Sequence, residues 1–134
     1  MQAITEQLKF WQRNSLPMMH QTEAAECGLA CIAMVAGFHG YNTSLNELRQ
    51  KFSLSIEGCT LLDLMNFAEK LQLSSRPLRI ELEDLAALQT PCILHWDLNH
   101  FVVLKSVRAS QVVIHDPALG IRKLTWEEAS KHFT

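Results

Sequence analysis

The thiol of Cys27 is the side chain whose position in the sequence most favours chemical reactivity. It lies near the start of residues 23–35, which are apolar nearly all round and predict a buried helix. Backbone N–H groups and the dipole at a helix N-terminus favour the thiolate, which is the reactive form of cysteine. Gly28 leaves room beside the sulfur for a substrate backbone. The alternative is that Cys27 is one more small buried residue, as free cysteines commonly are.

The carboxylate of Glu26 opposes ionisation of this thiol, so we expect a histidine, rather than the helix alone, to form an ion pair with it. His100 stands where a polar loop enters an apolar strand, and Asp116 stands where a strand leaves into a turn at Pro117. If the two strands form a hairpin centred on Arg108, the even separation sets His100 directly opposite Asp116 on one face, about 5 Å apart. A bulge would spoil this register. The same face would carry four apolar residues, Val102, Leu104, Val112 and Ile114.

These residue types suit thiol hydrolysis. An imidazole takes the proton of the thiol and returns it to the leaving amine, and an acid behind the imidazole fixes its orientation. Taken singly, His100 is also explained as a hydrogen-bonded strand-end histidine, and Asp116 as a turn start. The nearby competitors are His95, His115, Asp97 and Asn99. We rank His100 first because His95 is predicted to lie mid-strand and His115 to face away from Asp116.

The other cysteines are Cys31, Cys59 and Cys92. Cys31 lies one helical turn after Cys27, where two thiols have poorly directed Cβ vectors for a disulfide. A zinc site needs two further ligands at recognisable spacing, but Cys59 and Cys92 stand alone. We therefore expect Cys31 to belong to the core, and we expect no metal and no cofactor.

Composition indicates one globular domain. The 134 residues are 48% hydrophobic and 19% charged, with a formal net charge of -2, which does not call for nucleic acid as a partner. The alternative is a basic patch that forms only in three dimensions. The longest apolar stretch, residues 28–38, is too short to span a bilayer and begins too late for a signal peptide. The chain is therefore expected to be cytoplasmic, with reduced cysteines.

The periodicity of the chain changes from helical to strand-like after about residue 90, which predicts an α+β fold with an antiparallel sheet. Ser44 with Glu47, and Thr125 with Glu128, predict helix-capping boxes. Gly37 and Gly40 are expected to end the buried helix. The predicted elements are a weak helix at 1–13, an extended segment at 15–21, helices at 23–35, 44–52, 60–71 and 83–88, strands at 91–96, 101–107, 111–115 and 121–124, and a last short helix. The apolar positions expected to line the 60–71 helix are Leu61, Leu64, Met65, Ala68 and Leu71.

Three blocks of sequence then point to a family. They are Gln21-Thr22-Glu23 with Glu26-Cys27-Gly28, Asn99-His100-Phe101-Val102-Val103, and His115-Asp116-Pro117-Ala118, supported by the runs at 91–96 and 49–52. Over about residues 12–134 the chain resembles the double-glycine leader peptidases. These are papain-like N-terminal domains of ABC exporters for bacteriocins and microcins. The resemblance implies a helical N-terminal half packed on a C-terminal antiparallel sheet.

The resemblance also implies roles for four residues. Cys27 would be the nucleophile, His100 the general base and acid, Asp116 its orienting partner, and Gln21 an oxyanion-hole donor together with the Cys27 backbone N–H. The implied reaction is cleavage of a precursor peptide after a Gly-Gly motif, with the leader docked as a helix on an apolar groove. Trp96 would line the cleft or lie in the core.

The implied setting is the N-terminal part, residues 1–134, of a longer transporter. Its partners would be the precursor peptide and the membrane and nucleotide-binding domains of that exporter, at the cytoplasmic face of the bacterial inner membrane. No P-loop pattern occurs, so ATP binding is not predicted for these residues. The alternatives are a catalytically silent leader-binding module and a small thiol hydrolase or transglutaminase-like transferase.

Overall fold

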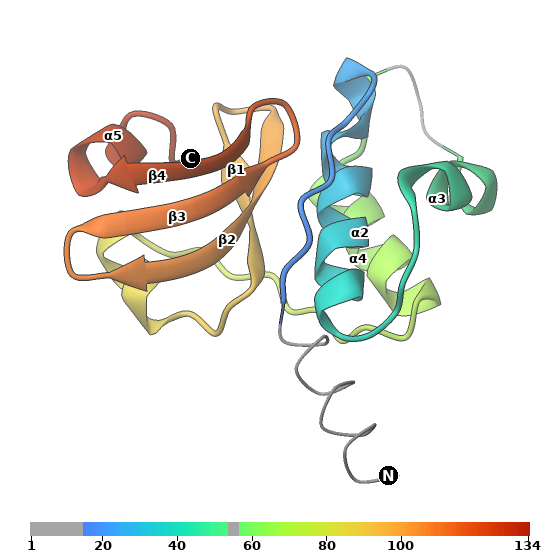
Figure 1. Cartoon of the computed structure of the whole chain (residues 1–134), viewed down its shortest axis with the longest axis horizontal. Coiled ribbons are helices and arrows are strands. Elements are labelled where there is room, and N and C mark those ends of the chain that lie inside the picture. The colour runs from blue at the N-terminus through green and yellow to red at the C-terminus, as the bar shows by residue number, and fades with distance from the viewer. Residues whose placement is uncertain (1–14, 54–56) are drawn as a thin grey trace, which may run out of the picture.

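The computed structural model describes residues 15–53 and 57–134. The weak helix predicted at 1–13 lies outside these residues. Helices α2, α3 and α4 gather on one side of the molecule and a four-stranded sheet with helix α5 on the other, with the segment from residue 15 running between them (Figure 1). In chain order the elements are the 3₁₀ helix η1 (Ala24–Glu26), helices α2 (Cys27–Phe38), α3 (Leu45–Lys51) and α4 (Leu61–Lys70), the 3₁₀ helix η2 (Leu82–Ala87), strands β1 (Cys92–Trp96), β2 (His100–Arg108), β3 (Gln111–Asp116) and β4 (Gly120–Thr125), and helix α5 (Trp126–Ser130).

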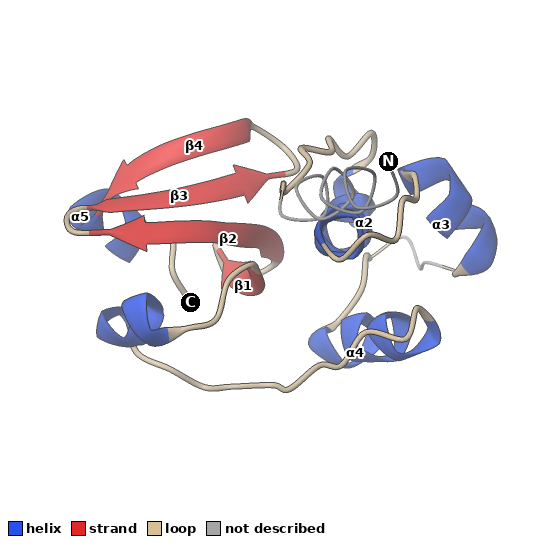
Figure 2. Ribbon diagram, turned by 60° about the horizontal axis from the view of Figure 1, so that its bottom comes forward, coloured by secondary structure: helices blue, strands red, loops and turns tan. Residues whose placement is uncertain are grey.

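The sheet is antiparallel throughout, in the order β1-β2-β3-β4. Seen from another side, α2 lies at one end of the sheet and α5 at the other (Figure 2). This arrangement confirms the α+β class and the packing of a helical half on an antiparallel sheet. No helix among residues 15–53 and 57–134 is long and apolar enough to cross a membrane.

Helix α2 is buried on most of its surface, as its apolar sequence predicts. It continues past Gly37, so the prediction that this glycine ends the helix is wrong. A Cβ at Gly37 would lie 2.8 Å from Cγ of Pro17, which shows that the glycine allows the 15–21 segment to pack closely. Gly40, with φ of 90°, follows the helix end instead.

The predicted caps form with one difference. Thr125 and Glu128 make a reciprocal capping box at the start of α5. At α3 the Ser44 hydroxyl accepts a bond from the Glu47 N–H at 3.1 Å, but the Glu47 carboxylate accepts one from Thr43 instead of closing the box. Helix α4 begins as predicted, but Leu61 is 51% exposed and does not join the core.

Strand β2 lies between two hydrophobic clusters. Its residues Phe101 and Val103 pack with α2, α3 and α4, whereas Val102 and Leu104 pack with η2, α5 and the other strands. Alternate side chains of a strand point to opposite faces, so β2 joins the two halves of the fold. Val112 and Ile114 lie in the same cluster as Val102 and Leu104, which confirms the predicted apolar face.

The register of the β2–β3 hairpin differs from the prediction. Its turn lies between Arg108 and Gln111, and the pairing shifts by one residue between Leu104 and Ser106. The exposed Lys105 is therefore the extra residue of a bulge. The direct pairing of His100 with Asp116 is therefore not formed, as expected for a hairpin with a bulge, but this bulge brings the two side chains back to one face of the sheet.

The two-residue turn alone would set Asp116 opposite Val103, and His100 would then point to the other face. Beyond the bulge Val103 pairs with His115, and one further step of this register sets Asp116 opposite Val102. His100, two residues before Val102, then shares a face with Asp116. The two side chains meet diagonally across the hairpin rather than directly.

Gly28 serves packing within the chain rather than access for a substrate. A Cβ built on it would lie 2.3 Å from Sγ of Cys59 and 2.8 Å from Cδ2 of Leu64. The space beside this glycine is thus filled by the segment before α4 and by α4 itself. The sequence-based interpretation of Gly28 as an opening for substrate is wrong.

We expect Gly28→Ala to lower the free energy of unfolding by about 1–3 kcal/mol, because the new methyl group overpacks this contact. Combining it with Cys59→Ala should cost less than the sum of the two single substitutions, since the sulfur is removed. Urea unfolding of the three variants measures this. Gly28→Ala with Cys92→Ala is the matched control and should be additive, and additivity in the Cys59 pair would contradict the contact.

Candidate active site

Cys27 is the first residue of α2, and its side chain is buried against β2. Burial raises the pKa of the Cys27 thiol. Hydrogen bonds from the His100 ring and from the backbone N–H of Phe101 outweigh this effect, and the pKa lies below its ordinary value. The expected dependence of thiol ionisation on a histidine is therefore met by His100.

His100 is the first residue of β2, and its Nε2 lies 2.8 Å from Oδ1 of Asp116. Since Nε2 is engaged there, Nδ1 is the ring nitrogen left for the thiol of Cys27. The hydrogen bond with Asp116, followed by the one with Cys27, raises the pKa of His100 to about 9. Both shifts favour a thiolate beside an imidazolium.

Asp116 is the last residue of β3 and is only 2% exposed. Its Oδ1 also accepts a hydrogen bond from the backbone N–H of Ala118 at 2.9 Å, and its Oδ2 lies 3.9 Å from Nη1 of Arg122. Burial raises the pKa of this carboxyl, but the hydrogen bonds from His100 and Ala118 lower it by more, so the pKa lies below its ordinary value. Asp116 is therefore held ionised behind the imidazole.

Gln21 belongs to the segment between the two halves. Its backbone N–H donates to the Pro117 carbonyl at 2.9 Å, which ties it to the residue after Asp116. Its Nε2 donates to the Glu23 carbonyl at 3.2 Å, and its Oε1 is buried with no partner among the described residues. An amide nitrogen carries two hydrogens, so one donor remains beyond the bond to Glu23.

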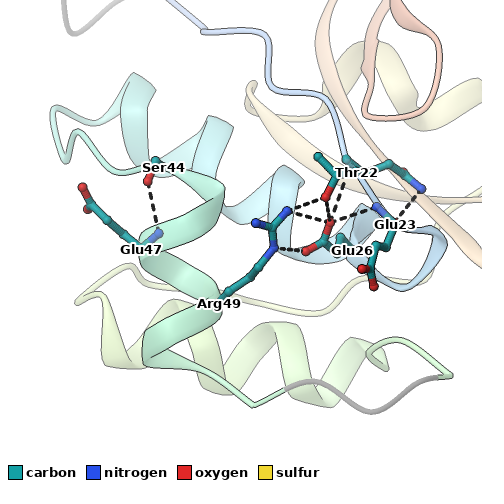
Figure 3. A network of polar contacts seen from close by, with 7 residues as sticks. Thr22, Glu23, Glu26, Ser44, Glu47 and Arg49 are labelled. Carbon is teal, nitrogen blue, oxygen red and sulfur yellow. Dashed lines mark hydrogen bonds and ion pairs between the residues drawn. The ribbon is translucent and has the colours of Figure 1, made fainter.

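Glu26, immediately before Cys27, lies at the centre of a polar network (Figure 3). Its Oε1 accepts hydrogen bonds from Thr22 N at 3.1 Å, Thr22 Oγ1 at 2.7 Å, Glu23 N at 3.0 Å and Arg49 Nη2 at 3.0 Å. Its Oε2 accepts one from Arg49 Nε. The bond with Arg49 outweighs burial and lowers the pKa of Glu26 to about 2.

The expectation that Glu26 opposes ionisation of Cys27 needs correction. The largest effects on the pKa of Cys27 come from burial, from His100 and from the backbone N–H of Phe101, and the Glu26 charge is compensated by Arg49 of α3. Sequence analysis missed this partner, because 23 residues separate the pair and no local pattern connects them.

The competing polar residues are held in other contacts. His115 is buried, with Nδ1 3.0 Å from the Pro17 carbonyl, and burial lowers its pKa. His95 is exposed, with Nδ1 3.2 Å from the Thr134 hydroxyl. Asp97 pairs with His132 at 2.8 Å, and Asn99 lies exposed in the turn before β2.

Trp96 is fully buried in the sheet-side cluster and stacks on His132. It is therefore a core residue, and its interpretation as a cleft-lining residue is wrong.

Cys31 is also fully buried, which confirms the core prediction. All four cysteines are free, and within residues 15–53 and 57–134 no group of three His, Cys, Asp or Glu side chains could hold a metal ion.

Comparison with known proteins places this chain in a family. Residues 15–134 match the peptidase C39 family model. The chain is 54% identical over 124 residues to the colicin V secretion/processing ATP-binding protein of Escherichia coli, covering 92% of this chain and 18% of that protein. It is 51% identical over 131 residues to the probable microcin-H47 secretion/processing ATP-binding protein of the same species, covering 98% and 19%. The chain thus spans less than a fifth of the length of these relatives.

Solved structures agree. A double glycine motif protease from an AMS/PCAT transporter, in complex with the leader peptide, superposes with a TM-score of 0.83 at 36% identity, over 91% of this chain and 88% of that one. The peptidase domain of Streptococcus ComA, described as a bi-functional ABC transporter, has a TM-score of 0.80 at 26% identity, over 90% and 93%. The chain therefore belongs to the peptidase C39 family and is a cysteine peptidase domain with the fold of the double-glycine leader peptidases.

Proposed function

We propose that this domain cleaves a precursor peptide after a Gly-Gly motif, with Cys27 as nucleophile, His100 as general base and acid, Asp116 as its orienting partner, and Gln21 as an oxyanion donor. The continuous contact from the Cys27 thiol through the His100 ring to the buried Asp116 carboxylate carries this proposal.

The proposed reaction begins with the Cys27 thiolate attacking the carbonyl carbon of the scissile bond. The tetrahedral oxyanion accepts hydrogen bonds from the Gln21 amide and the Cys27 backbone N–H. Imidazolium His100 gives its proton to the leaving amine, the C–N bond breaks, and a thioester with Cys27 remains. His100 then takes a proton from a water molecule that attacks the thioester, releasing the carboxylate of the leader and restoring the thiolate.

The substrate and setting are proposed from the relatives. One superposed structure is a double glycine motif protease bound to a leader peptide, and both E. coli relatives are named as secretion/processing ATP-binding proteins. We infer that residues 1–134 form the N-terminal peptidase part of an ABC exporter. Its partners would be the membrane and nucleotide-binding domains of that exporter, at the cytoplasmic face of the inner membrane. No cofactor enters the proposed reaction.

Removing the thiol or the base should abolish turnover. We expect Cys27→Ala to give no detectable cleavage of a Gly-Gly precursor and His100→Ala to lower kcat by roughly 10²–10⁴-fold. Gel or mass-spectrometric cleavage assays measure both. Cys92→Ala, which removes a thiol from the sheet-side cluster, is the control and should retain activity. Full activity of Cys27→Ala would refute the proposed nucleophile, whereas an inactive wild-type domain that binds leader would indicate a binding module.

The pH dependence of alkylation tests the thiolate–imidazolium pair. Cys27 has a lowered pKa, whereas burial raises the pKa of Cys59 and of Cys92 to about 11. Because only the thiolate reacts, iodoacetamide should label Cys27 at lower pH than these two. Asp116→Asn removes the main cause of the raised His100 pKa, so the Cys27 profile should move to higher pH.

The matched control for this shift is Asp97→Asn, which removes an exposed carboxylate paired with a different histidine. Its alkylation profile should equal that of the wild-type domain. Labelling of Cys27 at the same pH as Cys59 and Cys92, or an Asp116→Asn profile like that of the wild type, would contradict the proposed pair.

Substrate selection is tested with precursor peptides altered at the two glycines before the cut. A Val or Leu at either position should lower kcat/KM by at least tenfold, because a side chain there would crowd the thiol. Substitutions in the cargo beyond the cut are the control and should have smaller effects. Equal cleavage of all precursors would point to a less selective thiol hydrolase.

A further inference from the structure

We propose that Glu26 and Arg49 are positioning residues of this peptidase. Glu26 holds the segment that carries Gln21 in place, and Arg49 neutralises the Glu26 carboxylate beside the nucleophile. The inference rests on the proposed function, because it assigns the pair a part in presenting Gln21 and Cys27 to the substrate.

The Glu26 carboxylate is buried in the loop that precedes the nucleophile. Glu26 as a whole residue is 4% exposed, and it lies immediately before Cys27. Donors from Thr22, Glu23 and Arg49 point at it (Figure 3). They are the Thr22 N–H and hydroxyl, the Glu23 N–H, and the guanidinium of Arg49 from α3. Arg49 also donates to the Thr22 hydroxyl, so the guanidinium, the carboxylate and the loop form one closed network.

This network reaches Gln21 through the backbone. Glu26 fixes the peptides of Thr22 and Glu23 through their N–H groups. The Glu23 carbonyl in turn accepts the bond from Gln21 Nε2. On the other side the Gln21 N–H is held by the Pro117 carbonyl. The direction of the Gln21 amide is therefore set by Glu26 on one side and by the residue after Asp116 on the other.

Arg49 also has an electrostatic effect. A buried carboxylate without a partner is strongly destabilising, and it repels a second negative charge close by. Here the second charge would be the Cys27 thiolate. With Arg49 bound to both carboxylate oxygens, the carboxylate and the guanidinium together carry no net charge.

The other titratable groups near the thiol come from several elements. His100 of β2 hydrogen-bonds it, and Asp116 of β3 stands behind the histidine. Cys31 of α2 and Cys59 before α4 are near enough for a Cys27 charge to raise the pKa of each. Glu23 also interacts electrostatically with Arg49. These groups are unchanged in the variants below, so a shift reports the Glu26–Arg49 pair.

The first experiment measures the charge effect through alkylation of Cys27 by iodoacetamide, which needs no oxyanion donor. Arg49→Met should move the pH profile of alkylation to higher pH, because Glu26 is left uncompensated. Arg49→Met/Glu26→Gln should restore the wild-type profile. The matched control is Lys51→Met, which removes one positive charge from the same helix at a side chain that contacts Tyr41, and its profile should be unchanged. An unshifted Arg49→Met profile would overturn the charge part of the proposal.

The second experiment measures the placement of Gln21 through cleavage kinetics in the Arg49→Met background. Glu26→Gln keeps an acceptor oxygen for the loop and should retain kcat within a few-fold. Glu26→Leu has no acceptor and should lower kcat at least tenfold with little change in KM. Adding Gln21→Ala to Glu26→Leu should then cost much less than Gln21→Ala does in the Glu26→Gln background. Additive losses would show that Glu26 does not act through Gln21.

A conservative variant keeps the charge part of the proposal testable if Arg49→Met does not fold. Arg49→Lys keeps the charge but loses the two-pronged contact, so it should keep the alkylation profile and retain kcat within a few-fold, even if Arg49→Met proves unstable. A shifted Arg49→Lys profile would contradict the inference. Failure of these tests while Cys27→Ala remains inactive would reject the positioning role alone. Activity of Cys27→Ala would instead reject the proposed function.

Discussion

The fold is organised around one contact between its halves, that of the Cys27 thiol at the start of α2 with the His100 ring at the start of β2. Neither element could provide this contact alone, because the thiol belongs to the helical half and the imidazole to the sheet. Strand β2 holds the halves together by packing Phe101 and Val103 on the helices and Val102 and Leu104 on the sheet side. The packing of both hydrophobic clusters thus sets the distance between the thiol and the imidazole.

The electrostatics of the site follow from this placement. Burial by itself raises the pKa of a thiol and lowers that of an imidazole, and both side chains are largely buried. The structure opposes these effects with hydrogen bonds: His100 lowers the pKa of Cys27, and Asp116 raises the pKa of His100, so that a thiolate beside an imidazolium is favoured. Glu26, the residue immediately before Cys27, has its own counter-charge in Arg49. Each buried charge near Cys27 therefore has a partner from a different element.

Much of the fold could be predicted from sequence because its signals are local. Caps such as Thr125 with Glu128, the apolar stretch of α2 and the alternating strands each depend on residues within a few positions. The predictions that failed depend on contacts between distant segments. Gly37 is explained by Pro17, and Gly28 by Cys59 and Leu64, and no periodicity contains that information.

In the candidate site, too, local signals could be predicted from the sequence and contacts between distant segments could not. His100 and Asp116 were predicted on one face, but for a register that the hairpin does not adopt. The shift between prediction and structure is an even number of residues, so the shared face survived the error. The roles of Gln21, Cys27, His100 and Asp116 stay predictions. The Glu26–Arg49 network could not be predicted, because an ion pair between residues 23 positions apart has no signature in a single sequence.

The Lys105 bulge also limits how this hairpin can change in length. The turn by itself would place the His100 and Asp116 side chains on opposite faces, and the one-residue shift at the bulge returns them to the same face. Inserting or deleting one residue at either place would turn the imidazole and its carboxylate to opposite sides of the sheet. A compensating change at the other place, or a change of two residues, would keep them together. For this hairpin, whether an insertion or deletion is odd or even in length therefore matters more than how long it is. Length variants and grafted loops should be tolerated when they change the hairpin by an even number of residues.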